Sequence, residues 1–366
     1  MKRVIVGMSG GVDSSVAALL LKKQGYEVIG IYLKYSNSNI NTWSEDSISE
    51  DSIDAMLVSQ TLKIPFSIID ISKIYKKKII KYIYKEYRKG FTPNPDILCN
   101  SKIKFKIFLE KLIDLKSDFI ATGHYVIKKE IFENGKIYYQ IKSGIDQNKD
   151  QSYFLCKLNQ NQIKKSLFPL GNLTKKEVRQ IASKYHLINA KKKDSQGICF
   201  IGKIKLFNFL KLKLKKKEGS IIEINSKNSK KEDGKIIGKH IGAHFFTKGQ
   251  RKGLKIGGYK FPLFVIEKDI KNNILYVGMG KNHPGLYTKV VLIKKKNIHW
   301  INPNHDFFKK EVKCRIRYRQ KLQKATLYKK KNKIYVEFEI PQLAVNSGQF
   351  IVWYINNEVI GSGRIG

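Results

Sequence analysis

The run Ser9–Ser15 (SGGVDSS) constrains the fold more than any other part of this sequence. It joins Arg3–Ser9, an apolar segment typical of a buried parallel strand, to Asp13–Gln24, which reads as a helix ending at Gly25. Glycines allow close approach of a phosphate, and a helix N-terminus offers free N–H groups to an anion. Because the run matches neither the Walker loop nor G-x-G-x-x-G, it predicts a phosphate-binding turn of a different kind.

Strand-like and helix-length segments alternate over the first 125 residues. The further strands that we expect are Glu27–Leu33, Phe66–Asp70 and Phe119–Thr122, and the expected helices are Asp51–Leu62, Ser72–Lys89 and Ser101–Leu115. Strands separated by helices indicate βαβ units, so we expect an α/β domain with a parallel sheet and helices on both faces. From about residue 203 helices become scarce, apart from one near Ile204–Leu214. Short strands divided by glycines then predict a small mostly-β domain, followed from about residue 284 by an all-β domain or barrel.

Two local signals mark elements in the middle of the chain. Glu133-Asn134-Gly135 between Val126–Ile131 and Lys136–Ile141 predicts a β-hairpin. Thr174–Glu177 (TKKE) has the spacing of a capping box and predicts a helix that runs through Tyr185.

The chain carries a net charge of +41, from 71 Lys and Arg against 30 Asp and Glu. Such a surplus suits a polyanionic partner such as nucleic acid. Lys, Ile, Asn, Tyr and Phe are abundant together, however, which also indicates AT-rich coding that raises the lysine content without any ligand. Arginine is a more selective indicator of a polyanionic partner than lysine. Alternation in a strand would place Arg315, Arg317 and Arg319 on one face, either to contact a partner or as a solvated charged surface.

The expected cellular location rests on three features that this sequence lacks. No run of about 18 apolar residues is present, and glycines follow the basic start too soon for a signal peptide. Four cysteines in 366 residues are too few for a disulfide scaffold. We therefore expect a soluble, cytoplasmic protein that does not contact a membrane.

Cys99 lies in the proline-containing loop Thr92–Asn100 (TPNPDILCN). If a helix restarts at Ser101, Cys99 lies near its N-terminus, where the helix dipole favours the thiolate. Asp96 would then lie within proton-transfer reach of the thiol. A small buried cysteine is the alternative at this position.

A second cysteine, Cys199, favours a reactive role for Cys99 over a purely structural one. It lies in Asp194–Gly202 (DSQGICFIG), directly after the basic run Lys191–Lys193, which would lower the pKa of its thiol. Two such cysteines suit a reactive pair that passes sulfur as a persulfide and then closes a disulfide. Cys156 and Cys314 lack activating neighbours and are predicted to be structural. Since no C-x-x-C is present, we expect neither a zinc ribbon nor an iron–sulfur cluster.

His124 follows the expected strand Phe119–Thr122. The carboxyl end of a parallel strand faces the ligand crevice of an open α/β sheet, so a functional histidine is favoured there over a structural one. Gly123 would let a nucleotide approach the backbone. By itself, Lys149–Ser152 reads as a solvated polar turn.

Seven motifs occur in the order of a known family. They are SGGVDSS at 9–15, TPNPDILCN at 92–100, ATGHY at 121–125, KDQSYFL at 149–155, KKKDSQGICFIG at 191–202, GQRKGL at 249–254 and RYRQ at 317–320. Over essentially its full length the chain resembles the bacterial tRNA-specific 2-thiouridylases, whose SGGxDS turn is the PP-loop of N-type ATP pyrophosphatases. The resemblance implies a PP-loop catalytic domain over 1–202, a small central domain over 203–283 and a tRNA-binding β-barrel over 284–366.

The resemblance also implies roles for individual residues. Cys99 would be the nucleophile, Cys199 the persulfide carrier, and Asp96 a catalytic partner. ATP would contact Gly7, Met8, Ser9, Gly10, Gly11, Val12, Asp13, Ser14, Leu33 and Gly123. The target base would meet Asn94, Pro95 and Asp96, and the rest of the tRNA would meet His124, Lys149, Asp150, Gln151, Arg317, Tyr318 and Gln349. Leu33 stands where the family pattern has Met, an apolar exchange that preserves packing against adenine.

The implied reaction is transfer of sulfur to C2 of the wobble uridine U34 in tRNAs for Lys, Glu and Gln. ATP would adenylate the C2 oxygen so that it leaves as AMP, and Mg²⁺ would neutralise the phosphates, with Asp13 as one contact. A cysteine-desulfurase relay would load Cys199, and the protein would act as a monomer. Sulfur would reach the base either as hydrosulfide released by Cys99 or directly from the persulfide.

Two other classes of protein share some of these features. PP-loop ligases and amidotransferases have the ATP loop but need no cysteine pair. A non-catalytic RNA-binding protein with this fold would need neither the intact loop nor the cysteines.

Overall fold

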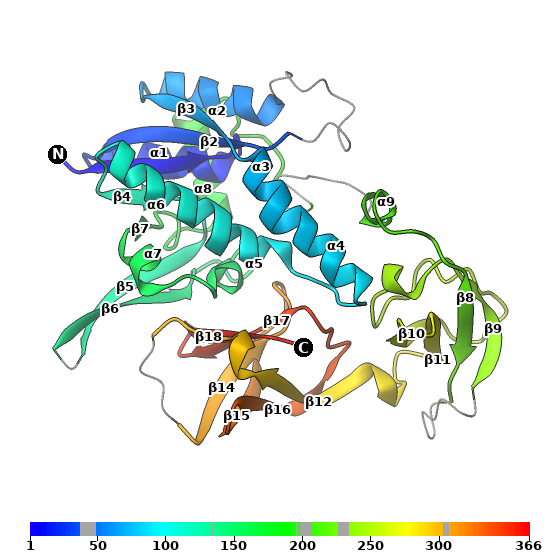
Figure 1. The fold of residues 1–366 in the computed structure, drawn as a ribbon. Coiled ribbons are helices and arrows are strands. Elements are labelled where there is room, and N and C mark those ends of the chain that lie inside the picture. The colour runs from blue at the N-terminus through cyan, green and yellow to red at the C-terminus, as the bar shows by residue number, and fades with distance from the viewer. Residues whose placement is uncertain are drawn as a thin grey trace.

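The computed structural model of the chain describes residues 1–366 except 37–48, 134, 195–196, 198, 200–205, 226–233 and 303–306. Figure 1 shows three parts: an N-terminal α/β domain, a C-terminal domain below it, and a small central sheet at the right. In the described part of the chain, no helix has the length and apolar character needed to cross a membrane.

A five-stranded parallel sheet forms the centre of the N-terminal domain, as the alternation of segments predicts. Its order is β3-β2-β1-β4-β7. The strands are β1 (Arg3–Met8), β2 (Glu27–Lys34), β3 (Phe66–Asp70), β4 (Phe119–Ala121) and β7 (Ser166–Leu167). The helices around them are α1 (Val12–Lys23), α2 (Glu50–Thr61), α6 (Phe105–Asp114), α7 (Gln160–Lys164) and α8 (Lys175–Lys184). The capping-box prediction is confirmed, because Thr174 caps α8 together with Glu177.

Strand β1 is buried on both faces, which is the reason for its continuous apolar sequence. Val4 and Val6 pack into a cluster with residues of α1, α2 and α8. Ile5 points to the opposite face, into a cluster with Ile103 and Phe105. Helices therefore cover both faces of the sheet.

Two helical segments contain a π-turn that the sequence pattern does not reveal. The first consists of α3 (Ser72–Tyr75), the π-turn Lys76–Ile80 and α4 (Lys81–Arg88). The second consists of α5 (Pro95–Cys99), the π-turn Asn100–Lys104 and α6. The predicted start of this second helix at Ser101 is wrong. It begins at Pro95, because Pro suits the first helical turn and the Asn94 side chain caps Ile97 N–H at 3.5 Å.

The C-terminal domain is an antiparallel sheet that includes the predicted hairpin from the N-terminal half. Its main path is β12-β16-β15-β14-β17-β18-β6-β5, and β13 pairs with β18. The strands are β5 (Val126–Glu133), β6 (Lys136–Ser143), β12 (Tyr287–Lys294), β13 (Ile298–Trp300), β14 (Lys309–Arg315), β15 (Gln323–Lys330), β16 (Lys333–Leu343), β17 (Phe350–Ile355) and β18 (Glu358–Arg364). Register Glu358 to Lys142 joins the hairpin to the rest of the sheet.

The expected arrangement of Arg315, Arg317 and Arg319 on one strand face is wrong. Strand β14 ends at Arg315, and a bend and turn follow. Arg315 is therefore buried, whereas Arg317 and Arg319 are exposed.

The central sheet has the order β10-β11-β8-β9. Its strands are β8 (Gly219–Glu223), β9 (Lys235–His240), β10 (Leu263–Asp269) and β11 (Ile274–Met279), and the short helix α9 (Leu206–Lys211) precedes them. This mostly-β domain agrees with the prediction, and the first two residues of the helix expected over Ile204–Leu214 lie outside the described part of the chain.

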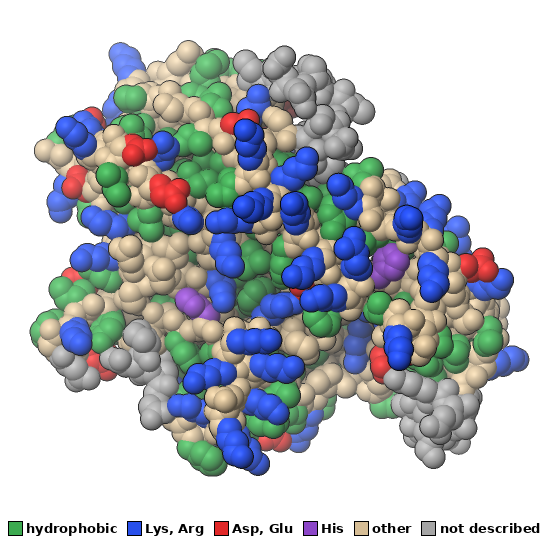
Figure 2. All heavy atoms as spheres, viewed as in Figure 1, with side chains coloured by type: hydrophobic (Ala, Val, Ile, Leu, Met, Phe, Trp, Pro, Cys, Tyr) green, Lys and Arg blue, Asp and Glu red, His purple; other side chains and the backbone are tan. Residues whose placement is uncertain are grey.

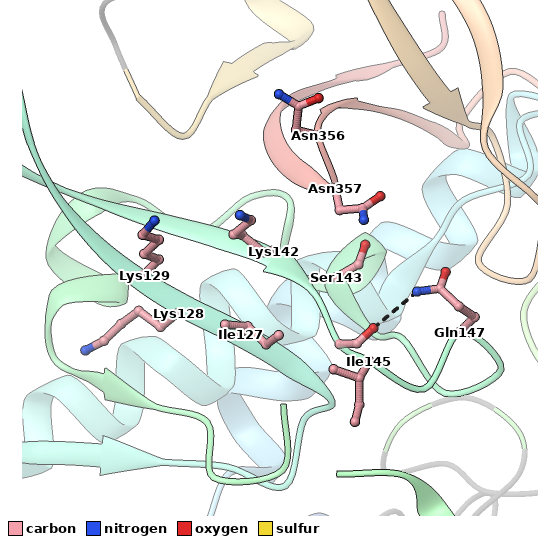
Figure 3. A pocket seen from close by; sticks show the side chains of 10 residues that line it. Ile127, Lys128, Lys129, Lys142, Ser143, Ile145, Gln147, Asn356 and Asn357 are labelled. Carbon is pink, nitrogen blue, oxygen red and sulfur yellow. Dashed lines mark hydrogen bonds between the residues drawn. The ribbon is translucent and has the colours of Figure 1, made fainter. Parts of the chain in front are cut away.

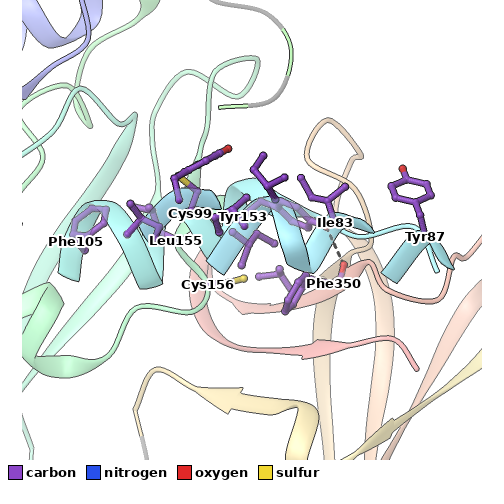
Figure 4. Packing of buried hydrophobic residues seen from close by; sticks show 14 of the residues in the cluster. Ile83, Tyr87, Cys99, Phe105, Tyr153, Leu155, Cys156 and Phe350 are labelled. Atoms are coloured by element: carbon purple, nitrogen blue, oxygen red, sulfur yellow. Dashed lines mark hydrogen bonds between the residues drawn. The ribbon is translucent and has the colours of Figure 1, made fainter. Parts of the chain in front are cut away.

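A shared core joins the N-terminal and C-terminal domains. Figure 4 shows Cys99, Tyr153 and Phe350 in one buried cluster, in which Tyr153 Oη donates to the Phe350 carbonyl at 3.0 Å. Cys156 and Cys314 are fully buried, in agreement with their predicted structural role. The helix that ends in Cys99 is thus held between two domains.

Candidate active site

The Ser9–Ser15 turn lies between β1 and α1, where the sequence predicts it. Ser9 N–H donates to Ser14 Oγ at 3.0 Å, and Ser14 Oγ donates to the Gly11 carbonyl at 3.0 Å. Gly10 has a φ of +73°, a conformation that favours glycine. No side chain caps α1, whose N-cap is Gly11. The first N–H groups of the helix are therefore free of a side-chain cap and suit an anion.

Three segments pack tightly against this turn. A Cβ at Gly10 would lie 2.1 Å from the Asp51 carbonyl oxygen at the start of α2, and a Cβ at Gly123 would lie 2.7 Å from the Asp13 backbone. Asn189 Nδ2 donates to the Gly10 carbonyl at 3.0 Å and to Ser15 Oγ at 2.9 Å. Glycine is thus required at both positions by backbone contact, which fixes the turn without a bound ligand.

An ion-pair network begins at Asp13 in the first turn of α1. Asp13 Oδ1 accepts from Tyr125 Oη at 2.7 Å and from Lys175 Nζ at 2.6 Å. Lys175 Nζ also pairs with Asp194 Oδ1 at 2.7 Å, and Asp194 pairs in turn with Lys149. Although burial opposes it, the hydrogen bonds from Lys149 and Lys175 lower the pKa of Asp194 to about 2. The sequence analysis did not single out Lys175 or Asp194 as a pair.

The apolar residues expected to contact ATP are buried. Met8 and Val12 pack into the α1 cluster, and Leu33 packs into the opposite cluster. A Cβ at Gly7 would lie 2.7 Å from the Phe108 ring, so this position requires a small residue for packing. These residues shape the end of the sheet rather than offer polar groups to a ligand.

Cys99 and Cys199 lie side by side although 100 residues separate them in the sequence. Both thiols are free, and they form a hydrogen bond with one another. Asp96 Oδ1 accepts the Cys199 N–H at 3.0 Å, and Tyr75 Oη donates to the Cys199 carbonyl at 2.5 Å. The backbone of Cys199 is thus held by Asp96, on the helix that carries Cys99, and by Tyr75 at the end of α3.

The two thiols differ in acidity. Burial raises the pKa of Cys99 well above its usual value, and its hydrogen bond to Cys199 adds to this effect. The same hydrogen bond, together with the positive charge of Lys104, outweighs burial and lowers the pKa of Cys199 to about 7. The expectation that a helix dipole activates Cys99 is therefore wrong, because Cys99 ends a five-residue helical segment and is buried.

Lys104 is a functional candidate that the sequence analysis missed. Burial disfavours its charge, but the negative charge of Cys199 and then of Cys99 raises the pKa of Lys104 above its usual value. Lys104 closes the π-turn Asn100–Lys104, which begins directly after Cys99. The extra residue of a π-turn changes which side chains share a face, so the sequence spacing gave no signal.

His124 lies at the end of β4, as predicted, with Thr122 Oγ1 2.7 Å from its Nδ1. Burial and then the nearby charge of Lys104 lower the pKa of His124 to about 3, so the ring is neutral at physiological pH. Among the described residues, no group of three or more His, Cys, Asp or Glu side chains could hold a metal ion.

Comparison with known proteins identifies the family. A model described as the tRNA methyl transferase HUP domain matches residues 2–203, one described as the tRNA methyl transferase PRC-barrel domain matches 207–279, and one described as the aminomethyltransferase beta-barrel domain matches 291–365. A tRNA-specific 2-thiouridylase of Karelsulcia muelleri is 75% identical over 100% of this chain and 98% of its own length. This chain belongs to the tRNA-specific 2-thiouridylase family.

More distant members match over similar lengths. The Flavobacterium johnsoniae 2-thiouridylase is 49% identical over 100% of both chains, and one from Geobacillus kaustophilus is 44% identical over 100% of this chain and 95% of its own. The domain models carry the name of methyl transferases. The PP-loop and the cysteine pair of this chain fit the 2-thiouridylase name of its relatives.

The residues expected to meet the target base lie at the start of the helix that carries Cys99. Asn94 caps that helix, Pro95 opens it, and Asp96 holds the Cys199 backbone. Gln349, expected to contact tRNA, donates to the carbonyls of Thr92 and Pro93 at 2.8 and 3.2 Å. In this structure Gln349 therefore holds the loop that leads to Asn94.

The Lys149–Gln151 loop is held by the C-terminal domain. The Asp150 side chain is enclosed, is 2.8 Å from Arg315 Nη1 and accepts the Ser152 N–H at 3.0 Å. Its carboxylate does not face solvent, so the structure favours a role in holding the loop over the expected direct contact with tRNA. Gln151 Oε1 likewise accepts the Tyr125 N–H at 3.1 Å.

Basic side chains cover the face shown in Figure 2, with few carboxylates between them. Arg317 is exposed and donates to the carbonyls of Leu343 and Ala344. The Tyr318 ring packs on the Phe154 ring, with the two ring centroids 4.5 Å apart. A hollow of about 360 Å³ lies between the β5–β6 hairpin and the turn after β17 (Figure 3). Its lining includes Lys128, Lys129, Lys142, Asn356 and Asn357. This surface has the charge expected of a tRNA-binding protein.

Proposed function

We propose that this chain converts the wobble uridine U34 of tRNAs for Lys, Glu and Gln to 2-thiouridine, with ATP and an enzyme-bound persulfide. The family to which the chain belongs transfers sulfur to tRNA. The observation that carries the proposal is the pairing of Cys99 with Cys199 next to Asp96, in a domain that also contains a turn suited to an anion.

The first step activates the base. The uracil O2 atom attacks the α-phosphorus of ATP, pyrophosphate leaves, and the base is linked to AMP through O2. The free N–H groups at the start of α1 would hold the phosphates during this step. Mg²⁺ would supply positive charge to the phosphates, and the Asp13 carboxylate is a hard oxygen donor beside the turn that fits it.

The second step loads sulfur on Cys199. The lowered pKa of its thiol, about 7, supports Cys199 as the thiolate that attacks the terminal sulfur of a donor persulfide. The donor's thiolate leaves, and Cys199 becomes the persulfide. A persulfide-carrying protein of a cysteine-desulfurase relay is the proposed donor.

The last step transfers sulfur to the base. Cys99 thiolate attacks the Cys199 sulfur, a Cys99–Cys199 disulfide forms, and hydrosulfide leaves with the electron pair of the broken S–S bond. Hydrosulfide adds to C2, AMP leaves, and loss of a proton gives 2-thiouridine. In the alternative order, the terminal persulfide sulfur adds to C2 first, AMP leaves, and Cys99 then attacks Cys199 to release the thiolated base. Either route leaves a disulfide that a thiol reductant must reduce before the next turnover.

Nucleoside mass spectrometry tests the whole proposal. The protein is incubated with unmodified tRNA(Lys), Mg-ATP, a persulfide donor and a thiol reductant, and the tRNA is digested. We expect a 2-thiouridine peak that requires ATP, with release of AMP and pyrophosphate. AMP release that needs no tRNA and leaves uridine unmodified would instead favour a PP-loop ligase.

A further inference from the structure

Lys175 occupies a fixed position at the first turn of α8. Its backbone N–H donates to Asp146 Oδ2 at 2.9 Å, and Thr174 and Glu177 cap the helix in which it is the first residue. Its side chain is only 12% exposed, although lysine is usually solvated. The backbone and the ammonium group of Lys175 are therefore both held by partners, and the ammonium group is not a freely solvated charge.

The ammonium group lies next to the phosphate-binding turn. Its Nζ atom is 2.6 Å from Asp13 Oδ1, and Asp13 is the second residue of α1, whose N-terminus has no side-chain cap. It is also 2.7 Å from Asp194 Oδ1. Lys175 thus bridges the anion-binding turn and the segment that leads to Cys199.

Charge explains why a cation is needed at this point. Two carboxylates, Asp13 and Asp194, lie beside a turn that would receive the phosphates of ATP. Like charges at such short range oppose binding, and a cation shared with the ligand removes that opposition. Among the ion pairs of the described residues, Lys175 is the cation that contacts both carboxylates.

We propose that Lys175 binds the phosphates of ATP, and that Asp13 and Asp194 hold its ammonium group in position when no nucleotide is bound. When ATP binds, the Lys175 Nζ atom moves away from Asp194 and donates hydrogen bonds to phosphate oxygens. Asp194 also pairs with Lys149, so this exchange connects the nucleotide to the Lys149–Gln151 loop. The inference deepens the proposed function, on which it rests for the choice of ATP as ligand.

Calorimetric titration of the full-length protein with Mg-ATP and, separately, with adenosine tests this role. Loss of one charge-assisted contact in Lys175→Met should weaken ATP binding roughly 10- to 100-fold. Adenosine has no phosphate, so its affinity should stay within about twofold of the wild-type value. Lys175→Arg, which keeps the charge, should recover part of the ATP affinity.

Lys176→Met is the matched control, because Lys176 is the exposed neighbour of Lys175 in the same helix. We expect wild-type affinity for both ligands. The proposal is overturned if Lys175→Met binds ATP as tightly as the wild type, or if its affinities for ATP and adenosine fall together. Neither measurement needs tRNA or sulfur, so a failure of thiolation would be seen separately from a failure of this inference.

Discussion

At the scale of single residues, the two cysteines of the candidate site differ in burial and acidity. Cys199 has the lowered pKa and two backbone anchors, whereas Cys99 is buried and keeps its proton. A thiol that donates a hydrogen bond to a neighbouring thiolate stabilises it, and Lys104 adds a positive charge. This asymmetry favours loading of sulfur on Cys199 before Cys99 reacts.

Lys104→Met should raise the pKa of Cys199. Removing a nearby positive charge should move the pH midpoint of Cys199 alkylation upward by at least about one pH unit from its value near 7. Iodoacetamide labelling, read out by mass spectrometry of the Cys199 peptide, gives that midpoint. The other groups that face the Cys199 thiol or Lys104 are Cys99, Asp96, Tyr75 and His124.

Lys102→Met serves as the control for this prediction, since Lys102 is exposed in the same π-turn. Its alkylation midpoint should equal that of the wild type. An unchanged midpoint in Lys104→Met would mean that Lys104 does not stabilise the thiolate. Because the thiolate fraction grows as pH rises through the pKa, sulfur loading in the wild type should also increase through about pH 7.

Cys99→Ser and Cys199→Ser should each lose ATP-dependent thiolation, since each lacks one sulfur of the disulfide that the reaction must close. Cys156→Ser should retain it, because Cys156 packs in the core and its pKa, raised by burial to about 12, keeps it protonated. Mass spectrometry of tRNA nucleosides measures all three. Full activity in Cys199→Ser would exclude its persulfide role, and full activity in Cys99→Ser would exclude the paired mechanism.

At the scale of elements, the helix formed by α3, its π-turn and α4 has two distinct faces. Tyr75, Ile79 and Ile83 are buried in the cluster that contains Cys99. Lysines of the same helix such as Lys77 and Lys81 are exposed. One helix therefore supports the cysteine site from within and presents positive charge outside.

Lys77→Gln/Lys81→Gln should weaken tRNA binding and reduce its dependence on salt. If each lysine contacts one phosphate, the slope of log affinity against log salt should fall by about 1.4 to 1.8 in magnitude. Filter binding at several salt concentrations measures the slope.

The control is Lys63→Gln/Lys116→Gln. Both residues are exposed and precede strands β3 and β4, so they lie at the amino end of the parallel sheet, away from the phosphate-binding turn. Equal slopes in the two double variants would show that the lysine surplus acts only through net charge.

At the scale of the whole molecule, the site depends on contacts between domains. Arg315 of β14 pairs with Asp150 in the enclosed loop, Gln349 holds the Thr92–Pro93 carbonyls, and Arg364 of β18 pairs with Glu86 of α4. The hairpin β5–β6 of the N-terminal half completes the C-terminal sheet. The C-terminal domain thus supports the candidate active site structurally and also carries part of the basic surface.

Arg315→Met should lower the free energy of unfolding by about 3–5 kcal/mol, because it leaves the Asp150 carboxylate buried without its cation. Urea denaturation measures the change. Lys239→Met removes one partner of an exposed ion pair, with Glu218, and should leave the free energy of unfolding nearly unchanged. Equal losses in both variants would contradict the importance of the buried pair.

The sequence alone determined what depends on neighbouring residues. The SGGVDSS turn, the alternation of strands and helices, and the capping box at Thr174 all rest on local backbone preferences, and each predicted its element correctly. The buried state of Cys156 and Cys314 also followed from their apolar or alternating surroundings. Local chemistry was enough in these cases because the interacting groups lie within a few residues of one another.

Only the tertiary structure decided which distant groups meet. Cys99 and Cys199 are 100 positions apart, and Lys175 is 162 positions from Asp13. The π-turn Asn100–Lys104 changes the helical spacing and places Lys104 near the two cysteines. Burial raises the pKa of Cys99. The hydrogen bond with Cys99 and the charge of Lys104 lower the pKa of Cys199. Acidity depends on burial and on charges brought together by packing, which sequence spacing does not encode.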